Sequence, residues 1–187
     1  MQMSSAVISE KQMPCETVVR ALNAKLPLDI VVLACEEVPF DFHARFDTKS
    51  KEYIYKIWNS EVRNPFLLDT VFQYKYKLDE VKLDKAAKDF IGTYDFGAFC
   101  ASGSSVLDTE RTVYSASVTR EGDMVIFKVS GDGFLYNMVR IMVGTLIYIN
   151  EGKIGQNDIK DIILSLDRSK AGKTVSPEGL YLNKVNY

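Results

Sequence analysis

A single arginine interrupts the most apolar stretch of the chain. Residues 133–149, GFLYNMVRIMVGTLIYI, predict a helix that is hydrophobic on nearly every side, with Arg140 as its one cation. Such helices are usually buried, and a buried guanidinium keeps its proton, so Arg140 needs a carboxylate or a phosphate. The alternative is that Arg140 lies on an exposed helix edge and extends its head into water. The candidate carboxylates, none singled out by its spacing, are Asp47, Asp95, Asp132 and Glu178.

Cations and aromatic rings alternate in the segment 42–58, FHARFDTKSKEYIYKIW. Single-stranded nucleic acid requires cations for its phosphates and rings on which its bases stack. Between residues 45 and 77, seven Lys and Arg face four Asp and Glu, in a chain of formal net charge −2. The alternative is a half-buried strand with lysines on its outer face. His43, the chain's one histidine, would by itself more often be a structural residue than a catalyst.

Other familiar site patterns are weak or excluded. Gly131-Asp132-Gly133 precedes the Arg140 helix, but no third glycine or Gly-Lys-Ser/Thr follows, so a tight turn is favoured over a phosphate cradle. A nucleotide-binding enzyme that uses these two glycines is therefore the least favoured hypothesis for the function of the chain. The three cysteines are far apart and odd in number, and with one histidine they offer no disulfide framework and no metal site. They are Cys15, Cys35 and Cys100.

Periodicity and turn residues predict the elements that position these groups. Predicted helices cover 14–26, the stretch from the N-cap Asp79 to Gly92, residues 133–149, and a last helix capped by Asn157. Predicted strands cover 30–34, 51–58, 71–76, 112–119, 124–130 and 179–187. The order favours an α+β fold: a mixed, largely antiparallel sheet with helices on one face.

Composition gives the remaining limits. Hydrophobic residues make up 47% and charged residues 26% of the 187 residues, as in ordinary globular proteins. No stretch is long and apolar enough to span a bilayer, and MQMSSAVISEKQM lacks the pattern of a signal peptide. The sequence therefore predicts a cytoplasmic protein that is not inserted in a membrane.

Four stretches together resemble one family, the tRNA pseudouridine synthase A family. They are LNAKLPLDI (22–30), FHARFDTKSKEYIYKI (42–57), GFLYNMVRIMVGTL (133–146) and SPEGLYL (176–182). RNPF (63–66) and GTYDFGAFCA (92–101) also fit, in the same order along the chain. The resemblance covers nearly the whole chain, and the combination of motifs is far more specific than any one of them.

The resemblance implies an isomerase that converts uridine to pseudouridine at positions 38–40 of the tRNA anticodon arm. It implies a homodimer with the pseudouridine synthase fold, without cofactor or metal. In the family an aspartate attacks or assists at the uridine, a tyrosine lies against the base, and an arginine pairs with the aspartate. By motif the tyrosine is Tyr53 and the arginine Arg140. The residues expected to bind substrate are His43, Arg45, Phe46, Lys49, Lys51 and Leu180.

One departure from the family is large. The family's aspartate lies in a Gly-Arg-Thr-Asp-Ala-Gly-Val-His motif, and that motif is absent from these 187 residues. The expectation is that the chain begins just after it. Residues 1–40 would then be the remnant of the N-terminal catalytic subdomain and 41–187 the C-terminal subdomain. The chain alone would be inactive, and the alternative is a non-catalytic RNA-binding or dimerisation module.

Overall fold

The computed structural model describes residues 13–103 and 106–187, which form two compact units, 13–47 and 48–187. We describe each unit by itself. The subdomain division expected between residues 40 and 41 stays a prediction.

The smaller unit is built around helix α1, Cys15–Asn23. Pro14 starts it, since its carbonyl accepts the N–H groups of Thr17 and Val18 at 2.8 and 3.1 Å. The helix ends earlier than the predicted residue 26. The strand predicted at 30–34 is wrong: these residues join no sheet in the described part of the chain.

At residues 30–34, the Asn23 side chain makes the hydrogen bonds that a neighbouring strand would make in a sheet. The Asn23 amide donates to the Val32 carbonyl at 2.9 Å and accepts the Val32 N–H at 2.7 Å. Both main-chain polar groups of Val32 are therefore paired without a ladder. The apolar run satisfies the requirement for main-chain hydrogen bonds locally, which the hydrophobic pattern does not reveal.

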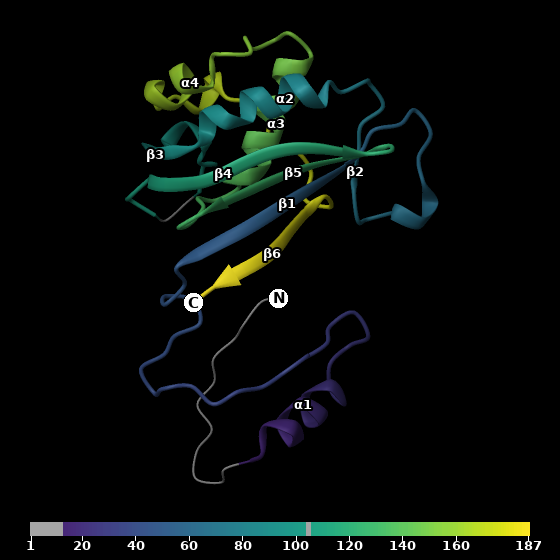
Figure 1. The fold of residues 1–187 in the computed structure, drawn as a ribbon, viewed down its shortest axis with the longest axis vertical. Coiled ribbons are helices and arrows are strands. Elements are labelled where there is room, and N and C mark those ends of the chain that lie inside the picture. Colours follow the sequence, from purple (N-terminus) through teal and green to yellow (C-terminus); the bar gives the residue numbers. More distant parts are fainter. Residues whose placement is uncertain (1–12, 104–105) are drawn as a thin grey trace. The chain divides into compact units, whose positions relative to one another are not determined.

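The larger unit contains a six-stranded sheet in the order β2-β1-β5-β4-β3, with β6 pairing β1 as well (Figure 1). Only β1 and β2 run parallel, and the other pairs are antiparallel. The mixed, largely antiparallel sheet of the predicted α+β fold is thereby confirmed. The strands are β1 Ser50–Trp58, β2 Phe72–Gln73, β3 Gly92–Asp95, β4 Glu110–Glu121, β5 Met124–Gly131 and β6 Leu180–Asn186.

Helices cover one face of this sheet (Figure 1). The α-helices of the unit are α2 Glu80–Ala87, α3 Met138–Asn150 and α4 Ile159–Ser165. Short 3-10 turns lie at Pro65–Leu67, Lys88–Phe90, Gly97–Phe99 and Arg168–Lys170. In the described residues, none of the helices has the length and apolarity needed to cross a bilayer.

The core lies between the sheet and these helices. Tyr55 of β1 is opposite Phe127 of β5, which is opposite Val118 of β4, and all three side chains are buried. Alternate residues of each strand face the helices, as the period-two pattern predicts. The buried face of β1 therefore carries Tyr53, Tyr55 and Ile57 next to one another.

Several local predictions differ from the structure: α2 ends at Ala87 rather than at Gly92, and the short strand β3 was not predicted. β2 is only two residues long because Asn59 replaces the ladder beyond it, donating to the carbonyls of Tyr74 and Tyr76 at 2.9 and 2.7 Å. The N-cap of α4 is Asp158 rather than Asn157, and the Asp158 carboxylate accepts the Gly155 N–H at 2.8 Å.

The Asp79 cap, by contrast, is confirmed. Its carboxylate accepts the Lys82 N–H at 3.0 Å in the first turn of α2. An aspartate in extended conformation at this position pairs one of the N–H groups that the helix leaves open, which is why the residue type predicts the helix start.

Candidate active site

The guanidinium of Arg140 is held by two neutral oxygen atoms. Its Nε donates to the main-chain carbonyl of Val175 at 2.7 Å, and its Nη1 donates to the side-chain carbonyl of Asn137 at 2.8 Å. The residue is half-buried. Arg140 is thus neither fully enclosed nor free in solvent: two hydrogen bonds fix its position, and neither compensates its charge.

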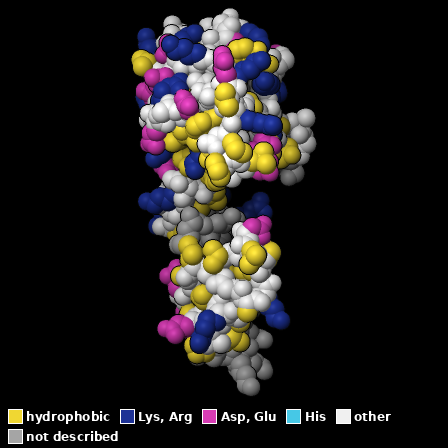
Figure 2. All heavy atoms as spheres, turned by 90° about the vertical axis from the view of Figure 1, so that its right-hand side faces the viewer, with side chains coloured by type: hydrophobic (Ala, Val, Ile, Leu, Met, Phe, Trp, Pro, Cys, Tyr) yellow, Lys and Arg dark blue, Asp and Glu magenta, His cyan; other side chains and the backbone are white. Residues whose placement is uncertain are grey.

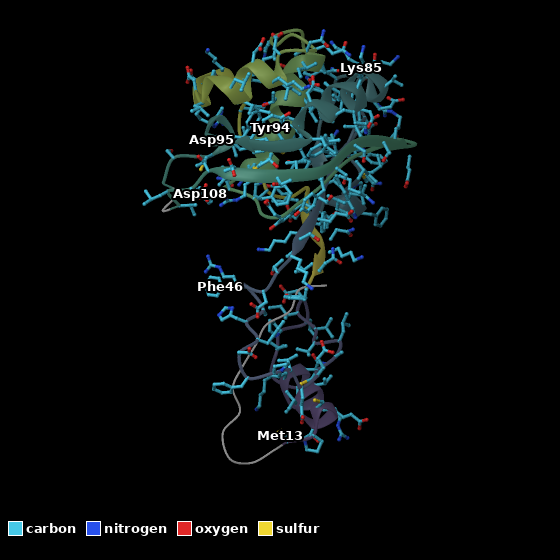
Figure 3. All side chains as sticks on the ribbon, turned by 60° about the vertical axis from the view of Figure 1, so that its left-hand side comes forward. Met13, Phe46, Lys85, Tyr94, Asp95 and Asp108 are labelled. Atoms are coloured by element: carbon cyan, nitrogen blue, oxygen red, sulfur yellow. The ribbon has the colours of Figure 1, made fainter. Side chains whose placement is uncertain are left out.

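No carboxylate in the described residues lies within salt-bridge distance of Arg140. Asp95 accepts hydrogen bonds from the Gly97 N–H and the Thr109 hydroxyl, and Asp132 accepts the Thr112 N–H. Figure 3 shows Asp95 beside Asp108 at one end of the sheet. The anion that the sequence predicts for Arg140 is therefore not Asp95 or Asp132.

Glu178 is a carboxylate whose pKa is affected by the charge of Arg140. A hydrogen bond from Ser176 lowers the pKa of the Glu178 carboxyl, and the positive charge of Arg140 lowers it further. Glu178 is exposed and forms no salt bridge with Arg140. Its influence is long-range, and solvent screens it.

Helix α3 starts later than predicted. It begins at Met138, not at Gly133, because Asn137 adopts the left-handed conformation with φ of 59° and separates residues 133–136 from the helix. From Met138 to Ile147 every residue except Arg140 is buried, so the predicted burial of this helix is confirmed. Arg140 thus lies in the first turn, beside the residue that interrupts the backbone.

A close backbone contact places the Val175 carbonyl. Gly144 of α3 packs directly on the segment 171–175: a Cβ on Gly144 would lie 1.8 Å from the Lys173 carbonyl oxygen. A Cβ on Gly172 would in turn lie 2.3 Å from the Gly144 carbonyl carbon, and the Gly172 N–H donates to the buried Thr145 hydroxyl at 2.8 Å. This contact lets the segment run along α3 as far as the Arg140 side chain.

Tyr53 lies on the helix-facing side of β1. Its ring contacts Phe134 edge-on, with ring centroids 5.2 Å apart and an interplanar angle of 82°. The side chain is half-buried, and burial raises the pKa of its phenol. Tyr53 is therefore a neutral hydrogen-bond donor at physiological pH, held by the segment that leads into α3.

Tyr55, two residues on, is a neighbour that sequence reasoning missed as a site residue. It is fully buried, and its hydroxyl donates to the Ser176 carbonyl at 2.6 Å. Burial raises its phenol pKa, whereas the Ser176 hydrogen bond and the charge of Arg140 act in the opposite direction. The alternation of Tyr53 and Tyr55 was the available signal. Leu180, the expected pocket residue, lies opposite Tyr55 on β6 and is half-buried.

Three expected substrate-binding residues form a turn in the smaller unit. The rings of His43 and Phe46 lie 4.3 Å apart, and the Arg45 guanidinium lies 5.7 Å from the Phe46 ring centroid. The His43 Nδ1 accepts the Arg45 N–H at 3.1 Å. Phe46 is 73% exposed and projects from its segment in Figure 3. The turn presents an exposed ring beside a cation.

The expected lysines do not share one face. Lys49 is exposed just before β1, and Lys51 lies on the side of β1 that carries Tyr53. Lys56 lies on the opposite side, where its ammonium is 4.6 Å from the Tyr181 ring centroid on β6. Lys51 therefore lies on the same side of β1 as Tyr53, whereas Lys56 lies on the other side.

In the Gly131-Asp132-Gly133 segment, strand β5 ends at Gly131 and the chain bends at Asp132. The Asp132 carboxylate accepts the Thr112 N–H at 3.0 Å, and a Cβ on Gly131 would lie 2.6 Å from the Thr112 carbonyl oxygen. These glycines permit close packing of two strands at the point where the chain leaves the sheet. The predicted tight turn is not found here, since the turn before α3 lies at residues 136–137. This geometry also gives the nucleotide-binding hypothesis no support.

The chain is similar to known proteins over nearly all of its length. Residues 86–187 match the tRNA pseudouridine synthase family. The tRNA pseudouridine synthase A of Acetivibrio thermocellus is 45% identical over 180 residues, which cover 96% of this chain and 74% of that protein. Its counterpart in Clostridium acetobutylicum is 48% identical over 174 residues, covering 93% of this chain and 71% of that protein. Identity of this extent spans both units, so the chain belongs to the tRNA pseudouridine synthase A family.

Proposed function

We propose that this protein is a homodimeric, cytoplasmic enzyme that isomerises uridine to pseudouridine at positions 38–40 of the tRNA anticodon arm. The observation that carries the proposal is the half-buried Arg140 guanidinium, held by the neutral oxygens of Asn137 and Val175. A guanidinium fixed in this way is ready to receive a carboxylate. Family membership makes the reactive aspartate the expected carboxylate.

In the proposed reaction the aspartate attacks or assists at the uridine while the C1′–N1 glycosidic bond breaks. The freed base turns, and C5 bonds to C1′, displacing the aspartate oxygen from C1′ where the aspartate attacked there. The proton on C5 is then lost, and N1 takes up a proton. Arg140 holds the aspartate carboxylate. Tyr53, a phenol whose pKa burial raises, lies against the base as the candidate for proton transfer, and Leu180 lines the pocket. No cofactor or metal is required.

We further propose that these 187 residues by themselves are inactive, because the aspartate motif is not among them. The non-catalytic alternative, an RNA-binding or dimerisation module, has one observation in its favour. Exposed apolar side chains on the loop after β1, namely Val62, Phe66 and Leu68, offer a surface to a partner, and hydrophobic groups gather on that side in Figure 2.

The function is tested with an extended form, in which the segment of a family relative that carries the aspartate motif precedes these 187 residues. Incubated with tRNA, the extended form should convert uridine at positions 38–40, read out by mass spectrometry of nuclease fragments. The control tRNA carries cytidine at those positions. Conversion at other uridines in both tRNAs would contradict the assigned substrate, and binding of tRNA without any conversion would support the module.

We predict that tRNA binding depends on Lys49, Lys51 and Lys56. Replacing all three by Ala should weaken binding by roughly tenfold at low salt, because each removes a cation available to a phosphate. The slope of log K against log salt should fall by about one for each phosphate that is no longer neutralised. Filter binding across a salt series measures both quantities.

The matched control replaces Lys85 of α2 and Lys160 of α4, which are exposed on helices in the layer covering the sheet. That variant removes positive charge without touching the expected RNA surface. The test variant removes three charges and the control two, so losses in proportion to those numbers would mean that net charge alone governs binding. An unchanged salt slope in the triple variant would place the RNA surface elsewhere.

A further inference from the structure

Asn137 does not act as an ordinary helix cap. It precedes α3, where an asparagine side chain normally accepts an N–H of the first turn. Here its side chain makes no capping hydrogen bond, although its position is the N-cap. Its carbonyl oxygen instead accepts Nη1 of Arg140 at 2.8 Å. The N-terminus of α3 therefore lacks a side-chain capping hydrogen bond, and the Asn137 amide oxygen binds the Arg140 guanidinium instead.

The backbone at Asn137 is also in an unfavourable region. Its φ of 59° is left-handed, a conformation that costs energy for residues other than glycine and that asparagine tolerates better than most. Such conformations persist where the surrounding structure requires them, and they concentrate at functional sites. Here the left-handed residue ends the 133–136 segment and places its side chain beside that of Arg140, three residues later.

Together with Val175, Asn137 fixes the plane of the guanidinium. One hydrogen bond is made at Nε and one at Nη1, so rotation of the planar group is blocked at two points. A guanidinium has five donor hydrogens in one plane. The remaining Nη hydrogens can therefore meet the two oxygens of one carboxylate in a parallel, bidentate arrangement.

We propose that Asn137 is a positioning residue, which orients the Arg140 guanidinium so that both Nη atoms receive a carboxylate. The inference rests on the proposed function in one respect: in the active enzyme that carboxylate is the catalytic aspartate. In the 187-residue chain, the same device makes Arg140 a receptor for small carboxylates. Asn137 touches no reacting atom and acts through Arg140 alone.

The test uses the 187-residue chain with 15N-labelled arginine and sodium acetate as the probe. The Nε–H signal of Arg140 is assigned from its loss in Arg140→Gln. In the unchanged protein, acetate should shift this signal saturably, whereas sodium chloride at equal ionic strength should not. Distinct signals from the two Nη groups are expected at low temperature, because the hydrogen bonds slow rotation about the Cζ–Nε bond.

Asn137→Gly is the decisive variant. Glycine adopts the left-handed conformation without strain, so the backbone is kept while the amide is lost. Acetate binding should weaken by about fivefold or more, as expected for the loss of a hydrogen bond to a charged group, and the two Nη signals should merge. In Asn137→Asp the new carboxylate should pair with Arg140 itself and abolish acetate binding.

Acetate affinity and Nη signals in Asn137→Gly that equal those of the unchanged protein would overturn the proposal. So would the absence of any acetate effect in the unchanged protein. Neither result depends on pseudouridine formation by the extended form, and failure of that assay would leave acetate binding intact. The positioning role and the proposed function can therefore fail separately.

Discussion

A polypeptide of these 187 residues alone is expected to form no measurable pseudouridine. Arg140 and Tyr53 are in place, but an arginine held by neutral oxygens and a neutral phenol supply no nucleophile. In other covalent enzymes, removing the nucleophile costs roughly a millionfold in rate, and a loss of that order is expected relative to the extended form. The measurement is release of tritium from tRNA labelled at C5 of uridine, since pseudouridine formation expels that hydrogen.

Two controls separate lost chemistry from lost folding or binding. The 187-residue chain should still bind tRNA in a filter assay, with an affinity that falls steeply as salt rises. The extended form with its motif aspartate replaced by asparagine should be as inactive as the 187-residue chain. Tritium release by the 187-residue chain within tenfold of the extended form would show that a residue within these 187 acts as the nucleophile.

The second large effect concerns stability. Replacing Gly144 by Ala should lower the free energy of unfolding by about 3 kcal/mol or more, although the same change at an open helix position gains about 1 kcal/mol. The added Cβ would lie 1.8 Å from the Lys173 carbonyl oxygen, a main-chain atom that cannot rotate away. Helix and segment must separate, and the Gly172 N–H then loses the Thr145 hydroxyl. Urea unfolding followed by circular dichroism measures the change.

Gly152 provides the matched control, just beyond the end of α3. Its φ is 72° and nothing lies within 4 Å of a Cβ placed there, so Gly152→Ala should cost only the strain of the left-handed backbone, about 1–2 kcal/mol. A Gly144→Ala loss no larger than that of Gly152→Ala would mean that segment 171–175 yields easily. In that case the close packing would not be what holds Val175 beside Arg140.

The strands of the larger unit were well predicted, because their side chains alternate against a single core. The expected strand 51–58 is β1 with one added residue, and the expected hairpin 112–130 is β4 and β5. Burial on one face imposes a period of two that sequence displays directly. The short strand β3, Gly92–Asp95, was not predicted. The failures at 30–34 and beyond Gln73 share one cause: the amides of Asn23 and Asn59 take the place of a strand's hydrogen bonds.

The candidate site divides in a similar way. Arg140 was noticeable because a cation in an apolar helix violates the pattern, and its partial burial follows from that pattern. No carboxylate of the described residues pairs with Arg140. The expected pairing with the family's aspartate therefore rests on the family resemblance alone. Asn137 was predicted to be part of the helix, since its left-handed backbone has no signature in hydrophobic periodicity. Val175 could not be found at all, because it contributes a carbonyl that every residue has.

The Val175 carbonyl has a consequence for which amino-acid substitutions the chain should tolerate. The acceptor for Arg140 Nε belongs to the peptide backbone, so drift at position 175 among apolar residues leaves the hydrogen bond unchanged. We expect the constraint to fall instead on Gly144 and Gly172, because a side chain at either position would collide with the opposite main chain. A mutational scan should find apolar replacements tolerated at the buried position 175 and any side chain disfavoured at the two glycines. The position of the Val175 carbonyl oxygen, which orients Arg140, would thus depend on Gly144 and Gly172 rather than on the side chain at position 175.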